Sequence, residues 1–154
     1  MAARILVVDD HEVVRQGVRA ILQARPDWEI CGEAIDGREA IRLTKELHPD
    51  VVVMDITMPH LSGLEASQEI AKLQLPSRVL IFTMHESKNL APSVQRAGTQ
   101  GYVVKSRAAQ DLIDAIDRLL VGGTFFDNPS PSGAKGEDKP GRDILLRQTL
   151  SWAW

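Results

Sequence analysis

Cysteine, aromatic residues and long apolar runs are all scarce in this sequence. The single cysteine, Cys31, excludes an intramolecular disulfide, and its apolar neighbours predict a small buried core side chain. Residues 5–8 are apolar, but two acids follow them directly, so they do not resemble a signal peptide. No apolar run reaches the length of a membrane span. We therefore expect a cytoplasmic protein without a membrane segment.

A large excess of charge of either sign is also missing. The formal net charge is −3, the isoelectric point is about 5.8, and 25% of the residues are charged. Domains that bind nucleic acid usually carry a basic surface, so the composition predicts no DNA binding by this chain as it stands. The 154 residues are enough for one globular domain with a hydrophobic core and a tail.

Short apolar runs alternate along the chain with segments whose apolar residues recur at helical spacing. The apolar runs, which are rich in β-branched residues, predict strands at residues 4–8, 28–34, 51–55, 78–82 and 101–104. The amphipathic segments predict helices at residues 11–24, 37–47, 64–73 and 108–121. Strict alternation of strand and helix predicts an α/β domain with a parallel sheet and right-handed crossovers.

The segment between the last two predicted strands departs from this regularity. A helix is expected over residues 86–98, but Pro92 lies within it. Proline lacks a backbone N–H and clashes with the preceding helical turn. We therefore predict a helix that is short, delayed or irregular.

The composition changes after Asp127. Residues 128–143 are rich in proline and glycine, which predicts a flexible linker between a globular domain over residues 1–127 and a tail over residues 144–154. The tail regains apolar residues, among them Trp152 and Trp154, so it is either a short amphipathic helix that contacts a partner or a disordered end. It contains no basic two-helix segment of the kind that enters a DNA groove.

Reactive side chains follow the predicted strands at the points where each strand ends. Asp55 alone could cap a turn or could display a carboxylate at the sheet edge, where open α/β sheets bind their ligands. Asp9 and Asp10 follow the first strand, Thr83 follows the fourth and Lys105 follows the fifth. Because parallel strands end at one edge, we expect all five side chains to lie close together.

Three clustered carboxylates require a cation. At an effective dielectric constant near 20, each close pair of like charges costs about 4 kcal/mol. Carboxylate oxygens suit a hard divalent ion, and Mg2+, which keeps several waters and often shares its site with phosphate, fits best. A carboxylate beside Mg2+ can act as a nucleophile towards phosphorus and form an aspartyl-phosphate. The charge of Lys105 and the hydroxyl of Thr83 would then stabilise the phosphoryl oxygens.

The sequence as a whole resembles a response-regulator receiver domain over residues 4–122. Four motifs and one glycine carry the resemblance: VVDDH at 7–11, VMDITMP at 53–59, FTMH at 82–85, GYVVK at 101–105, and Gly63. The acids and histidine at 9–11 followed by VRQGV at 14–18 resemble the NarL/LuxR-type subfamily, whose helix-turn-helix effector is missing here. The resemblance implies a flavodoxin-like (βα)5 three-layer sandwich with a five-stranded parallel sheet in the order 2-1-3-4-5.

The resemblance also implies a role for each site residue. It assigns Asp55 as phosphoacceptor, Asp10 as a direct Mg2+ ligand, Asp9 as a ligand through water, the backbone carbonyl of Thr57 as a further ligand, Lys105 as the phosphate-pairing lysine, Thr83 as the switch hydroxyl and Tyr102 as the switch aromatic. Tyr102 could instead be an ordinary core residue. Met84 could narrow access to Asp55, and His85 either lines the entrance or is simply exposed. We interpret His11, His48 and His60 as surface or turn residues.

We therefore predict a phosphorylation-activated receiver of a two-component system. A sensor histidine kinase or a small phosphodonor would phosphorylate Asp55, and the change would alter partner affinity or form a homodimer through a receiver helix face. Such a domain is not an enzyme with a separate substrate, although it catalyses its own phosphorylation and slow dephosphorylation. The alternatives are a truncated DNA-binding regulator, a Mg2+-dependent phosphohydrolase with an aspartyl nucleophile, and a degenerate receiver that acts only through protein contacts.

Overall fold

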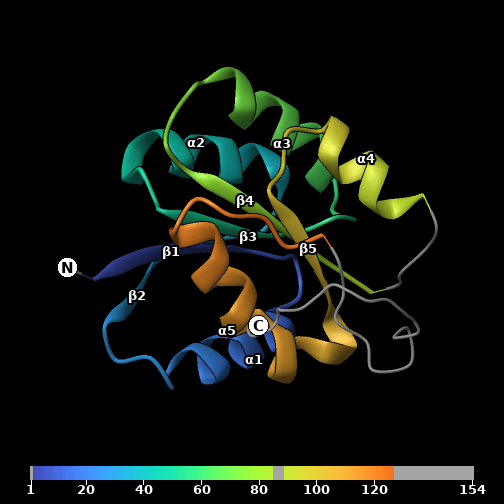
Figure 1. Cartoon of the computed structure of the whole chain (residues 1–154). Helices are drawn as coiled ribbons and strands as arrows, with labels where there is room; N and C mark the ends of the chain where they lie inside the picture. Colours follow the sequence, from blue (N-terminus) through green and yellow to red (C-terminus); the bar gives the residue numbers. More distant parts are fainter. Residues whose placement is uncertain (1, 85–88, 127–154) are drawn as a thin grey trace.

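The structure, a computed structural model, describes residues 2–84 and 89–126 and forms a three-layer α/β sandwich (Figure 1). Five parallel strands lie in the order β2-β1-β3-β4-β5. The strands are β1 (Ala3–Val8), β2 (Trp28–Ala34), β3 (Val51–Asp55), β4 (Arg78–Thr83) and β5 (Gly101–Val104). The helices are α1 (Glu12–Leu22), α2 (Gly37–Leu47), α3 (Gly63–Lys72), α4 (Leu90–Arg96) and α5 (Ala108–Leu120), and a short 3-10 helix covers Lys105–Arg107. The predicted fold class and strand order are confirmed.

The central strands are covered on both faces. Every residue of β3 is buried, in keeping with its run of three valines, because β-branched side chains suit a pleated surface with neighbours on both sides. Helices α1 and α5 cover one face of the sheet, and α2, α3 and α4 cover the other (Figure 1). Both layers that cover the sheet are apolar, so reactive polar side chains are confined to the edges of the sheet.

Strand β2, at one edge of the sheet, carries a β-bulge. Ile5 pairs with Ile30 and Leu6 pairs with Gly32, which leaves Cys31 as an extra residue without a partner on β1. Cys31 packs against the core on the side of α2, but it is only partly buried. The expectation of a small buried core side chain is therefore confirmed only in part, because an edge strand keeps one side towards solvent.

Helix α4 is short, as the position of Pro92 predicted. It spans seven residues, and Pro92 is its third residue. In the first turn of a helix the backbone N–H groups have no intrahelical acceptor, so the missing donor of proline costs little there. The remaining predicted elements agree with the observed ones to within one or two residues at each end. Residues 85–88, which include His85, lie outside the described residues.

The chain returns to the sheet after α5. The Phe125 N–H donates to the Gln100 carbonyl at 2.9 Å, and the Phe125 carbonyl accepts from Tyr102 at 3.0 Å. The globular unit therefore extends at least to this contact. The predicted linker over residues 128–143 and the tail over 144–154 lie outside the described residues and stay predictions.

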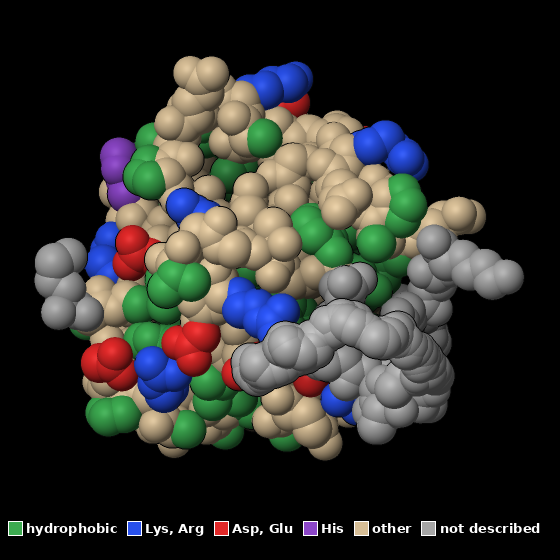
Figure 2. Space-filling view, viewed as in Figure 1, with side chains coloured by type: hydrophobic (Ala, Val, Ile, Leu, Met, Phe, Trp, Pro, Cys, Tyr) green, Lys and Arg blue, Asp and Glu red, His purple; other side chains and the backbone are tan. Residues whose placement is uncertain are grey.

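The surface carries no extended region of one charge on the face seen in Figure 2. Acidic and basic side chains of the described residues alternate there with apolar ones, in keeping with the small net charge. Of the helices in residues 2–84 and 89–126, none has both the length and the apolar character needed to cross a bilayer.

Candidate functional site: an acidic pocket at the carboxyl edge of the sheet

Two buried carboxylates and one lysine meet at the carboxyl edge of the sheet. Asp55 ends β3 and is 3% exposed, and Asp9 follows β1 and is 1% exposed. Lys105, directly after β5, places its Nζ atom 2.9 Å from Asp9 Oδ2 and 3.2 Å from Asp55 Oδ1. The sequence correctly predicted that three separate strands bring these side chains together.

Asp10 and His11 extend this pair into a larger cluster. Ligand atoms of Asp9, Asp10, His11 and Asp55 all lie within 4.8 Å of one another. The Asp10 side chain is 30% exposed, so one side of the cluster is open to water. One lysine cannot neutralise three carboxylates, and the cluster therefore carries an excess of negative charge.

The cluster fits a hard divalent cation such as Mg2+. The Asp9 Oδ2 atom is fully buried and accepts no hydrogen bond of acceptable geometry from the described residues, although Lys105 lies close as a counter-charge. A buried carboxylate oxygen normally has hydrogen-bond partners, so this atom has unused capacity for a cation or its water. All three acids offer oxygen ligands, which Mg2+ prefers, and the exposed side leaves room for the waters that Mg2+ retains.

His11 belongs to this site, although the sequence suggested only a surface residue. Its side chain is 66% exposed, as expected, but its Nδ1 atom lies 3.1 Å from Asp9 Oδ1 and 3.2 Å from Asp10 Oδ1. Its backbone N–H also donates to Asp9 Oδ1 at 2.8 Å. The sequence signal that could have placed His11 in the site was its position directly after Asp9 and Asp10. His48 and His60 are exposed turn residues with positive φ, as predicted.

The environment of Asp55 favours its protonated form. Burial raises the pKa of Asp55, and the nearby Asp9 carboxylate raises it further. Lys105 and a hydrogen bond from the Thr57 backbone act in the opposite direction, but the net effect is a pKa above the ordinary value of 3.8. A cation bound beside Asp55 would favour the ionised form and so oppose this rise in pKa.

The loop after Asp55 is shaped by Gly63. A Cβ atom at this position would lie 2.1 Å from the Asp55 carbonyl oxygen, so only glycine fits. The Gly63 N–H donates to the Ile56 carbonyl at 2.8 Å, which closes the loop. Ser62 and Glu65 form a capping box at the start of α3. This packing fixes the loop that follows Asp55 at the carboxyl edge of the sheet.

A cleft opens above the acids. Thr83 is almost fully buried at its base, whereas Met84 is 62% exposed. The side chains lining it include Asp10, Asp55, Thr57, Thr83, Met84 and Lys105. The predicted site residues are thus brought together, with one exception. Tyr102 is buried in the core on the side of α4, outside the cleft wall, and its switch role stays a prediction.

A doubly wound parallel α/β sheet with an acidic cluster at the carboxyl edge beside its central strands defines a class of proteins that bind charged ligands at that edge. Within this class, residues 5–117 match the response regulator receiver domain family, and the chain belongs to that family. Its relatives place it with receiver domains of two-component response regulators of the NarL/LuxR type.

Two relatives and one solved structure illustrate the similarity. The chain is 40% identical over 113 residues to the transcriptional regulatory protein LiaR of Bacillus subtilis, covering 73% of this chain and 54% of LiaR. It is 33% identical over 123 residues to DegU of Brevibacillus brevis, covering 80% of this chain and 52% of DegU. The crystal structure of a LuxR-family two-component response regulator from Aurantimonas superimposes with a TM-score of 0.79 at 41% identity, covering 88% of this chain and 94% of that chain. The chain thus spans about half the length of the curated relatives it matches.

Proposed function

We propose that this chain is a phosphorylation-controlled switch that accepts a phosphoryl group on Asp55. The observation that carries the proposal is the position of the Lys105 ammonium between two buried carboxylates, 3.2 Å from Asp55 Oδ1. A lysine held there by Asp9 is already placed to pair with a phosphoryl group when one is transferred to Asp55. The raised pKa of Asp55 fits a carboxylate whose ionised form a bound cation would stabilise.

In the proposed reaction an Asp55 oxygen attacks the phosphorus of a phosphohistidine or of acetyl phosphate. A bond forms between this oxygen and phosphorus, and the bond from phosphorus to the donor nitrogen or oxygen breaks, with its electron pair leaving on the donor. Lys105 pairs with the phosphoryl oxygens, and the Thr83 hydroxyl hydrogen-bonds one of them. The carboxylate of Asp10, water held by Asp9 and the backbone carbonyl of Thr57 would hold Mg2+, which supplies positive charge at the transferred group.

The proposed output is a shift between two conformations. The phosphoryl oxygens on Asp55 draw Thr83 inward, and Tyr102, on the neighbouring strand β5, follows. Phosphorylation changes the equilibrium only by the difference in its interactions with the two states, so the output is a changed affinity for a second copy or another partner. The proposed phosphodonor is a sensor histidine kinase or a small phosphodonor, and the proposed location of this chain is the cytoplasm. The domain has no separate substrate and only adds and slowly loses its own phosphoryl group.

Incubation with Mg2+ and acetyl phosphate tests the site assignment. Intact mass spectrometry should show the gain of one phosphoryl group on the unaltered chain and none on Asp55→Asn. Asp114→Asn, which changes an exposed aspartate of α5, serves as the matched control and should be phosphorylated normally. A phosphoryl gain that survives in Asp55→Asn would overturn the assignment of Asp55.

A further inference from the structure

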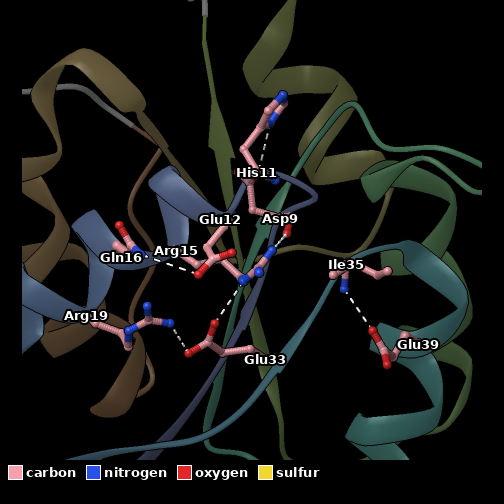
Figure 3. A network of polar contacts seen from close by, with 9 residues as sticks. All are labelled: Asp9, His11, Glu12, Arg15, Gln16, Arg19, Glu33, Ile35 and Glu39. Carbon is pink, nitrogen blue, oxygen red and sulfur yellow. Dashed lines mark hydrogen bonds and ion pairs between the residues drawn. The ribbon is translucent and has the colours of Figure 1, made fainter.

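An arginine on α1 contacts the backbone of Asp9, one of the acids of the cluster. Arg15 Nη1 donates to the Asp9 carbonyl oxygen at 2.6 Å, and Arg15 Nε donates to Glu33 Oε1 at 2.8 Å (Figure 3). The Arg15 side chain is only 14% exposed. Its planar guanidinium can hold two acceptors at fixed directions at once, which a lysine cannot do.

Glu33 fixes the arginine from the neighbouring strand. It lies near the end of β2, opposite Val7 of β1, and its second carboxylate oxygen accepts a hydrogen bond from Arg19, one helical turn further along α1. Figure 3 shows Arg15 and Arg19 reaching Glu33 from one side of α1. The Glu33 carboxylate thus binds two arginines. One of them, Arg15, also donates to the carbonyl of the peptide that joins Asp9 to Asp10.

The backbone of Asp9 is held from two sides. Its N–H donates to the Ala34 carbonyl at 3.0 Å, and its carbonyl accepts from Arg15. Strand pairing ends at Val8, so the peptide that joins Asp9 to Asp10 lies beyond the β-ladder. The direction of Asp10 depends on the plane of this peptide. The Arg15 hydrogen bond therefore takes the place of the missing ladder where Asp9 and Asp10 must be oriented.

We infer that Arg15 and Glu33 are positioning residues for the metal site and that they set its affinity for Mg2+ without touching the ion. The inference rests on the proposed function, because it assumes that Asp9 and Asp10 bind Mg2+. Partners of metal ligands commonly change metal affinity by ten to a hundredfold when they are removed. We expect an effect at the lower end of this range, since the hydrogen bond from Arg15 reaches the backbone of Asp9 and not its carboxylate.

A purely electrostatic role would give a different pattern of changes. The positive charge of Arg15 repels Mg2+, so charge alone predicts tighter binding in Arg15→Gln and unchanged binding in Arg15→Lys. A positioning role predicts weaker binding in both variants, because neither side chain can bridge the Asp9 carbonyl and Glu33 as the guanidinium does. Glu33→Gln weakens binding in either case, so the two arginine variants decide between the electrostatic role and the positioning role.

The test is a titration of the full-length chain with Mg2+ alone, followed by calorimetry or by amide chemical shifts. The dissociation constant should rise about tenfold in Arg15→Lys, in Arg15→Gln and in Glu33→Gln. Asp117→Asn is the matched control: it removes the ion pair with Arg25, 2.9 Å in length, which lies away from the acids. This control should bind Mg2+ as the unaltered chain does, and metal-free amide spectra report whether each variant is folded.

The outcomes separate the inference from the proposed function. Folded Arg15→Lys and Arg15→Gln that bind Mg2+ as tightly as the unaltered chain, or more tightly, would overturn the inference and leave the proposed function standing. No Mg2+ binding by the unaltered chain would overturn the metal site of the proposed function, and the inference with it. Equal weakening in Asp117→Asn would also contradict the inference, because it would reveal a general effect of lost ion pairs.

Discussion

The Lys105 ammonium lies between two buried carboxylates, 2.9 Å from Asp9 Oδ2 and 3.2 Å from Asp55 Oδ1. One ammonium group is therefore the counter-charge of two carboxylates that are almost fully buried. Removing a partner from a buried ion pair is costly, because the remaining charge keeps its desolvation penalty. The arrangement is stable only as long as the lysine or an added cation is present.

Lys105→Gln should lower the free energy of unfolding by about 3 kcal/mol in the absence of divalent cations. The loss should shrink when Mg2+ is added, since the ion replaces part of the missing charge. Urea denaturation with and without Mg2+ measures both effects. Lys72→Gln is the control, because it breaks an exposed pair with Glu69 and should change stability by less than about 1 kcal/mol. A Lys105→Gln loss as small as that of Lys72→Gln would contradict the prediction.

Asp55→Asn should stabilise the metal-free protein at neutral pH. The pKa of Asp55 is raised in the folded state above its ordinary value of 3.8, so the folded chain binds this proton more tightly than the unfolded chain. The stability of the unaltered protein then falls as pH rises from about 3.8 through the raised pKa. Asparagine cannot ionise, so the advantage of Asp55→Asn should be absent at acid pH and grow to a plateau above the raised pKa. Melting curves from pH 3 to pH 8 without metal provide the measurement.

The ion pairs of Glu33 predict the opposite dependence on pH. Burial by itself raises the pKa of Glu33, but hydrogen bonds from Arg19 and Arg15 outweigh this effect and hold the pKa below its ordinary value of 4.5. The stabilisation is therefore present above about 4.5 and is lost as pH falls through the lowered pKa. Glu33→Gln should cost about 1 kcal/mol at pH 7 and progressively less below that range.

Glu46→Gln provides the control for this pH series. Glu46 pairs with Arg42 on the surface of α2, and both side chains are 56% exposed. The substitution should change the unfolding free energy by only a few tenths of a kcal/mol at any pH, because solvent screens the pair. A Glu33→Gln cost that is constant from pH 7 to pH 3 would refute the assignment of the effect to this carboxylate.

Two glycine-to-alanine substitutions should have opposite effects on stability. Gly17 lies inside α1, and a Cβ atom there would have no neighbour within 4 Å. Gly17→Ala should therefore raise the unfolding free energy by about 0.5 to 1 kcal/mol through the higher helix propensity of alanine.

Gly63→Ala should destabilise the protein, because the added methyl group would overlap the Asp55 carbonyl. The backbone would have to move, at a cost of about 1 to 3 kcal/mol. Thermal melting measures both glycine variants, and phosphorylation by acetyl phosphate should be slowed only in Gly63→Ala, since this substitution displaces Asp55, the proposed phosphoacceptor. Equal melting temperatures in the two variants would contradict the close contact.

The fold could be predicted because its signals are local and repeated. Three consecutive valines before Asp55 indicate a strand buried on both faces, and helical spacing of apolar residues indicates each covering helix. The site followed from topology, since parallel strands end at a common edge and bring Asp9, Asp55 and Lys105 together. Neither inference required side-chain distances.

The contacts that sequence reasoning missed depend on tertiary register. Arg15 and Glu33 are 18 residues apart and belong to different elements, so no local pattern links them. The same is true of His11, whose direction towards the acids is set by the turn between β1 and α1. Pro92 gave the right outcome, a short helix, although its place in the first turn of α4 makes it tolerated there.

The bulge in β2 determines which layer receives the side chain of Glu33. Trp28 and Ile30 face the side of α1 and α5, whereas Cys31 and Gly32 both face the side of α2. Because two consecutive residues face the same side, the alternation of the residues that follow is shifted by one position. Glu33 therefore points towards α1 and contacts Arg15. A strand of uninterrupted alternation would place the same carboxylate in the apolar layer under α2. The bulge at Cys31 is therefore part of the chemistry of the acidic site, because it absorbs one extra residue in β2 and keeps Glu33 on the side of Arg15, which holds the backbone of Asp9.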